Sequence, residues 1–213
     1  MTNKLLDIIK EKFPLSPIDC GEYAQMKVSG MKFSITAYKA AGLGHISVMQ
    51  ASGFLGLMKM DTLIINPTEL DLPLYSYDRI FAMGNDTLIV ELYDTLSGKF
   101  SEEKLNEAKA KHSHLTERDP GEHWYDSIKL DSSISKKGKK PETPELDSLA
   151  VDHFNAYVNS MAKKGDKAVK AKKADLYVNG LIEKGGPSTD VFKNAIGVEK
   201  TRDLFEKILF GTK

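Results

Sequence analysis

The chain has 213 residues, and its 30 basic and 30 acidic side chains leave a formal net charge of zero. A neutral chain has no overall field that attracts nucleic acid or an anionic membrane, so we expect neither as a partner and any charged partner has to meet a local patch. The single cysteine, Cys20, excludes an internal disulfide, and no secretory leader or apolar run of spanning length is visible. We therefore expect one cytoplasmic domain over residues 1–213, because no linker divides the chain.

The first half of the chain predicts one helix followed by strands. A helix over residues 3–12 has its apolar side chains on one face and is stopped by Pro14. Alternating or short apolar runs then predict strands at 32–38, 45–50, 58–65, 79–83 and 87–92. Short loops that contain glycine separate several of these segments, which is typical of an antiparallel meander.

The second half predicts helices. Ser101 caps one, and apolar positions at helical spacing predict others at 145–164, 174–183, 188–196 and 198–210. Gly185-Gly186-Pro187 supplies a break and a start signal among them. We interpret the lysine cluster 136–140, in the loop-rich segment 112–144, as a solvated tip that is also suited to an acidic partner, and the lysine-rich stretch 163–173 as exposed. Strands followed by helices predict an α+β fold.

The sequence contains none of the common catalytic motifs. It has no glycine fingerprint for dinucleotides, no phosphate loop, no Cys-x-x-Cys, no His-Glu-x-x-His and no Gly-x-Ser-x-Gly. Nucleotide, zinc and hydrolase functions are therefore disfavoured. His112 and His114 share a predicted loop without recognisable further ligands, so we predict no metal site.

Three segments resemble the ferredoxin-dependent bilin reductases. Residues 60–78 (MDTLIINPTELDLPLYSYD) and 87–94 (TLIVELYD) are similar to the core strands of that family. The tail 187–210 resembles its two closing helices, of which one ends at glycine and the other in aliphatic-Leu-Phe. Residues 124–129 resemble the edge strand that follows, and enzymes that reduce the red chlorophyll catabolite are relatives. The resemblance implies an α/β/α sandwich with a central antiparallel sheet flanked by helices and a pigment pocket on one side.

The resemblance also implies a chemistry. Such enzymes reduce a linear tetrapyrrole, for example biliverdin, with single electrons from ferredoxin or a flavodoxin-like carrier, while the protein supplies protons and binds no organic cofactor. Asp78 matches the central aspartate of the family and is implied to be the catalytic proton donor, with Tyr75 and Tyr77 helping to desolvate it. Alternatively, Asp78 caps a turn or pairs with Arg79.

The family pattern is incomplete at two positions. Thr62 stands where some members carry a histidine, and Ser47 or Gln50 stands where many carry a glutamate. We assign Gln50 and Thr62 to substrate binding, together with His45, which is otherwise an exposed residue at a strand start. Glu91 matches an acidic family position to which we give a structural role.

Two further groups of residues suit a large acidic pigment. Arg79 and Lys129 are candidates to bind propionate groups at the pocket rim. The methionines of the strand block suit either a broad flat ligand or an ordinary core; they are Met49, Met58, Met60 and Met83.

The missing donors leave two alternatives to a reductase. One is a non-catalytic carrier of tetrapyrroles that kept the scaffold but lost part of the set that delivers protons. The other is an interaction module with a degenerate pocket, which would bind no pigment.

Overall fold

Eight strands form one antiparallel sheet in the computed structural model, which describes residues 1–186 and 188–213. The strands are β1 (Leu15–Ile18), β2 (Gln25–Val28), β3 (Met31–Ala40), β4 (Gly44–Gly53), β5 (Met58–Pro67), β6 (Leu74–Ala82), β7 (Asn85–Tyr93) and β8 (Ile134–Lys139). Their order is β1-β3-β4-β5-β6-β7-β8, and β2 pairs with β3 next to β1. From β2 to β8 each strand pairs with the next in the sequence, as a meander requires.

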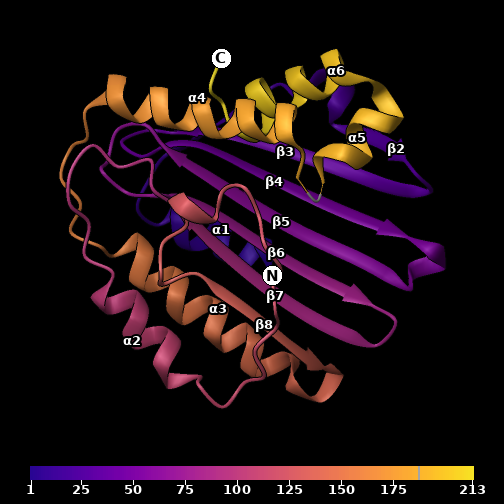
Figure 1. Ribbon diagram of the computed structural model, residues 1–213, viewed down its shortest axis with the longest axis horizontal. Helices are drawn as coiled ribbons and strands as arrows, with labels where there is room; N and C mark the ends of the chain where they lie inside the picture. Colours follow the sequence, from indigo (N-terminus) through magenta and orange to yellow (C-terminus); the bar gives the residue numbers. More distant parts are fainter. Residues whose placement is uncertain (187) are drawn as a thin grey trace.

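Helices cover both sides of this sheet (Figure 1). They are α1 (Thr2–Lys10), α2 (Glu103–Lys111), α3 (Thr143–Val158), α4 (Lys167–Lys184), α5 (Thr189–Ile196) and α6 (Val198–Asp203), which continues into a π-helical turn at Leu204–Leu209. Short 3-10 helices lie at Gly21–Tyr23, Phe54–Gly56, Asp126–Ile128 and Lys140–Glu142. The predicted α+β sandwich, with a central antiparallel sheet between helices, is confirmed.

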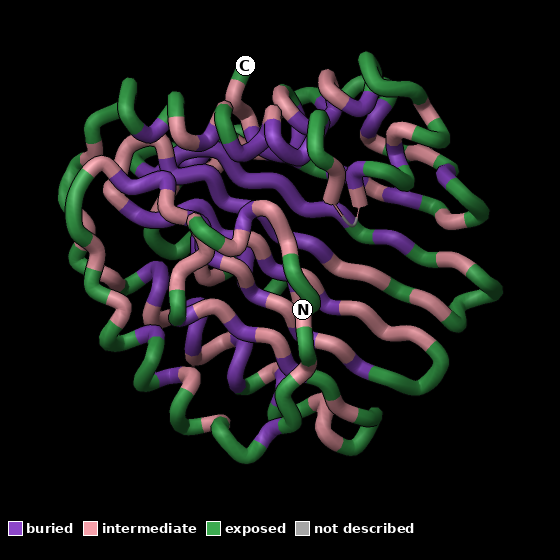
Figure 2. Tube along the Cα trace, viewed as in Figure 1, coloured by how far each residue is buried: buried purple, intermediate pink, exposed green. Residues whose placement is uncertain are grey.

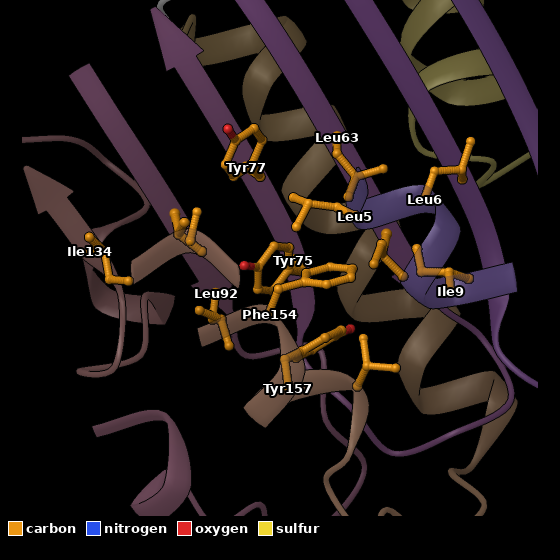
Figure 3. Packing of buried hydrophobic residues seen from close by; sticks show 14 of the residues in the cluster. Leu5, Leu6, Ile9, Leu63, Tyr75, Tyr77, Leu92, Ile134, Phe154 and Tyr157 are labelled. Atoms are coloured by element: carbon orange, nitrogen blue, oxygen red, sulfur yellow. The ribbon is translucent and has the colours of Figure 1, made fainter. Parts of the chain in front are cut away.

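The strands have two sides because successive side chains point to opposite faces. One side, here called the closed face, packs against α1, α2 and α3. Tyr75 lies there with its ring centroid 4.6 Å from that of Tyr157 and 5.4 Å from that of Phe154 (Figure 3). The other side, here called the hollow face, packs against α4, α5 and the π-helical turn.

Side chains of the sheet hold the end of the chain in place. Asn66 donates a hydrogen bond of 2.8 Å to the carbonyl of Phe210, and Ser47 donates one of 2.7 Å to the carbonyl of Leu209. The Nε2 atom of His45 lies 2.7 Å from the carbonyl oxygen of Ile208. The last carbonyls of a helix have no partner within the helix, so these polar side chains satisfy them. Burial lowers the pKa of His45, so the neutral ring donates this hydrogen bond.

Several local predictions were wrong. Residues 124–129 form no strand but contain a 3-10 turn, and the edge of the sheet is β8, which includes most of the lysine cluster. Lys136 is buried, because its ammonium group binds the carbonyl of Leu115 and the carboxylate of Glu117. Lys170 is also buried. The start signal at Pro187 lies outside the described residues.

Candidate functional site

A cavity of about 360 Å³ lies between the hollow face and the helices that cover it. Its walls are mainly apolar, as is usual for pockets that bind small molecules. Met49, Met58 and Met60 line it, whereas Met83 does not and is exposed at a hairpin turn. Polar groups line it from β5, β6 and β7, from the segment before the 3-10 helix Asp126–Ile128, and from the start of α5. They are Thr62, Ser76, Asp78, Glu91, Arg118, His123, Ser188 and Thr189.

Asp78 is the carboxyl group that the sheet presents to this cavity from the middle of β6. Thr62 is its partner across the β5–β6 pair and donates a hydrogen bond of 2.5 Å to Oδ1. Burial raises the pKa of Asp78 to about 6, the hydrogen bond from Thr62 opposes this rise, and the negative charge of Glu91 adds to it. A carboxyl group with this pKa exchanges a proton close to neutral pH.

Glu91 is a second carboxyl group in the cavity wall, on the neighbouring strand β7. It accepts a hydrogen bond of 2.6 Å from the hydroxyl of Tyr93. The Nζ atom of Lys129 lies 3.8 Å from Glu91 and 2.6 Å from Asp126. Lys129 does not itself line the cavity, and its nearest link to the cavity wall is this pairing with Glu91.

His123 and Tyr125 are cavity residues that the sequence interpretation missed. Their rings stack with centroids 4.8 Å apart and an interplanar angle of 12°. The Nδ1 atom of His123 is buried and, among the described residues, accepts or donates no hydrogen bond. The run of aromatic residues at 123–125 in a polar segment could have marked them as candidates for the site. Nothing in the sequence, however, places this segment at the cavity.

Four predicted binding residues do not line the cavity: Lys129, described above, and Arg79, Gln50 and His45. Alternation along the strands explains Arg79 and Gln50. Asp78 faces the cavity, so its neighbour Arg79 faces the other side, where it binds the carboxylate of Asp86. Met49 faces the cavity, so Gln50 points away, and its Nε2 atom lies 3.4 Å from Asp61. His45 holds the tail instead.

The same alternation corrects the expected surroundings of Asp78. Tyr75 and Tyr77 lie on the closed face, so neither desolvates that carboxyl group. The phenylalanines and tyrosines of the cavity wall are Phe33, Tyr93, Tyr125, Tyr177, Phe192, Phe205 and Phe210. Mid-strand Asp78 also caps no turn and does not pair with Arg79.

Sequence comparisons identify no relatives: no family model matches the chain, and no curated protein matches it either. A structural comparison does. The crystal structure of phytochromobilin synthase from tomato in complex with biliverdin is similar with a TM-score of 0.75 and 16% sequence identity, over 100% of this chain and 83% of that chain. At this identity the similarity establishes the fold, so the expectation that the chain folds like a bilin reductase is confirmed.

Within 1–186 and 188–213, no helix is long and apolar enough to cross a membrane. In the same ranges, no three histidine, cysteine or acidic side chains lie close enough together to hold a metal ion.

Proposed function

We propose that this protein reduces a linear tetrapyrrole bound in the cavity on the hollow face, with electrons taken one at a time from ferredoxin or a flavodoxin-like carrier. One observation carries the proposal: Asp78, with a pKa raised to about 6, faces a cavity of about 360 Å³. The fold is that of a protein whose crystal structure contains biliverdin. A bilin is a broad apolar chromophore, and the apolar walls of the cavity suit it.

In the proposed reaction two electrons and two protons saturate one double bond of the pigment. Each electron from the carrier raises the basicity of the conjugated system, and Asp78 then transfers its carboxylic acid proton to a pigment carbon. The resulting carboxylate regains a proton from water before the second transfer. Thr62 holds the carboxyl group in one orientation, since its hydroxyl donates to Oδ1.

Arg118 is better placed than Arg79 to bind a propionate group of the pigment. It lines the cavity and is only partly buried, whereas Arg79 is occupied by Asp86 on the closed face. A guanidinium group can bind both oxygens of a carboxylate. Lys129 contributes a further positive charge behind Glu91.

An anaerobic absorbance titration with biliverdin, followed by reduced ferredoxin, tests the proposal. Wild type and Asp78→Asn are compared, with Asp7→Asn on the exposed surface of α1 as the matched control. We expect all three to bind the pigment and only wild type and the control to form reduced product. Product formation by Asp78→Asn at the wild-type rate would exclude Asp78 as the donor.

A non-catalytic carrier is the second candidate, and the state of Glu91 favours it. Apart from Asp78, Glu91 is the carboxyl group lining the cavity in the described part of the chain, and Tyr93 and Lys129 already engage it. Ser47, one of the two residues matched to the position where many bilin reductases carry a glutamate, binds the tail of the chain, and Gln50, the other, points away from the cavity. Pigment binding without turnover in wild type would identify a carrier, and no spectral change would contradict both candidates.

A further inference from the structure

Two hairpin turns carry large apolar side chains into solvent at one end of the sheet. The β4–β5 turn contributes Phe54, Leu55 and Leu57, and the β6–β7 turn contributes Met83. These four residues, here called the apolar tips, are between 60% (Phe54) and 106% (Leu55) exposed, and Figure 2 shows both turns as exposed. The turns are adjacent, because the backbone N–H of Met83 donates to the carbonyl of Leu57 at 3.4 Å.

The backbone conformation of three of the apolar tips is strained for residues other than glycine or asparagine. Phe54, Leu55 and Met83 have φ values of 53°, 55° and 52°, in the left-handed region that glycine or asparagine adopts with less strain. Large apolar side chains at these positions stay mostly exposed, from 60% for Phe54 to 106% for Leu55. The arrangement is therefore better explained by a surface that these side chains contact outside the chain.

Lysines surround the apolar tips. The strand ends at this edge carry Lys27 on β2, Lys32 on β3, Lys59 on β5, and Lys137, Lys139 and Lys140 at the end of β8; we call these six residues the lysine collar. All six are exposed, and among the described residues none forms an ion pair with a carboxylate.

Two carboxylates near this end have partners within the chain. Asp86 is buried against Arg79, and Glu142 accepts a hydrogen bond of 2.8 Å from the backbone N–H of Lys139. The register places the collar beside the tips, because Lys32 and Lys59 both pair with Ser52, next to the β4–β5 turn. A chain without net charge thus has a strongly basic local surface at its most apolar exposed point.

We propose that the apolar tips and the lysine collar dock onto an anionic lipid surface. Apolar side chains on exposed turns enter the boundary between headgroups and acyl chains, and lysines around them bind the anionic headgroups. A folded protein partner would need a pocket that matches these protruding side chains. A fluid lipid interface needs none. A second copy of the chain is disfavoured, because tip-to-tip contact would bring two lysine collars together. This proposal departs from the expectation, based on net charge alone, that no membrane is a partner.

Docking would orient the cavity. Met31 and Met58, which line it, are the first residues of β3 and β5 and lie next to these turns. The methionine end of the cavity would therefore face the lipid. Lipid binding itself requires no pigment and stands apart from the proposed reductase activity, so vesicle experiments and pigment titrations fail independently.

The test is flotation of the purified protein with vesicles of phosphatidylcholine alone and of an equal mixture with phosphatidylglycerol. We expect binding to the anionic vesicles only, weakened by salt. Leu55→Ser with Met83→Ser should weaken binding by about tenfold or more, and so should Lys32→Glu with Lys59→Glu. The matched controls are Leu176→Ser with Met161→Ser, which are exposed apolar residues elsewhere, and Lys172→Glu.

Each other outcome would overturn the proposal. Absence of binding to either vesicle, or equal binding to both, excludes recognition of anionic lipid. Equal weakening by the control substitutions shows that the tips are not the contact. Loss of a dimer in Leu55→Ser with Met83→Ser, measured by sedimentation in the absence of vesicle binding, would assign the tips to a second copy. Tip-dependent binding of an acidic protein without vesicle binding would assign them to that class of partner.

Discussion

The two faces of the sheet are built from the same strands but differ in what fills them. On the closed face, Tyr75, Phe154 and Tyr157 are fully buried and in mutual contact (Figure 3). On the hollow face, a cavity of about 360 Å³ separates the sheet from its helices, and Asp78 and Glu91 face it. The strand β6 contributes side chains to both faces, because Tyr75 points to the closed face and the next residue, Ser76, points to the hollow face. The closed face can therefore stabilise the fold, while the hollow face holds carboxyl groups whose burial lowers stability.

The largest effect should come from opening a space on the closed face. We expect Phe154→Ala to lower the free energy of unfolding by about 3–5 kcal/mol, since the packed layer cannot collapse around the lost ring. Phe192→Ala, the same change at a buried residue that lines the cavity, should cost about 1–3 kcal/mol, because that ring already borders a space. Urea unfolding measures both. Equal losses would show that the two faces do not differ in packing.

Asp78→Asn should stabilise the protein near neutral pH. The folded-state pKa of Asp78 is about 6, above its ordinary value of 3.8, so the folded state holds the proton more tightly. Wild-type stability therefore falls as pH rises from about 4 to about 6 and stays lower above that range. We expect the asparagine variant to gain about 1–3 kcal/mol at pH 7 and nothing below about pH 4. The free energy of unfolding of both proteins is measured across pH. A stability difference between Asp78→Asn and wild type that did not change with pH would contradict this expectation.

The sequence predicted most of β3, β4, β5 and β7, because apolar patterns and glycine turns are local signals, but its strand at 79–83 covers only the end of β6 and leaves Asp78 outside. The sandwich of sheet and helices was implied by the family resemblance. The sequence also identified Asp78 and Thr62 as neighbours of the site, and the structure places both in the cavity wall. Alternation along a strand would have excluded Arg79 and Gln50 from a cavity faced by Asp78 and Met49. The two residues are adjacent in sequence to residues that face the cavity, although adjacent strand residues point to opposite faces.

Other features depended on contacts between distant segments and had no local signal. His45 binds the carbonyl of a residue 163 positions later. The lysine-rich helix α4 appeared solvated, yet the ammonium group of Lys170 binds the carbonyls of Leu72 and Thr95. His123 reaches the cavity from a segment without regular structure. Such pairings follow from the folded chain, and a pattern of residue types does not contain them.

Thr62→Val should shift the pH dependence of the proposed reduction upward. The hydroxyl of Thr62 stabilises the charged form of Asp78, so its removal raises the pKa of that carboxyl group above about 6. Reduction requires the protonated acid and therefore falls as pH rises through this pKa. We expect the alkaline limb of the single-turnover rate, measured at saturating pigment, to move to higher pH in Thr62→Val. An unchanged limb would mean that another group titrates.

Glu91→Gln should move the same limb the other way and by less. The negative charge of Glu91 disfavours ionisation of Asp78, so its removal lowers the pKa of Asp78, whereas the contribution of the Thr62 hydrogen bond is larger. Tyr93→Phe serves as the control, because it removes a hydrogen bond to Glu91 and keeps the charge. Opposite shifts in Thr62→Val and Glu91→Gln would identify Asp78 as the group that titrates, since both variants act on it from neighbouring strands of the hollow face. Parallel shifts would instead indicate a general change in the cavity.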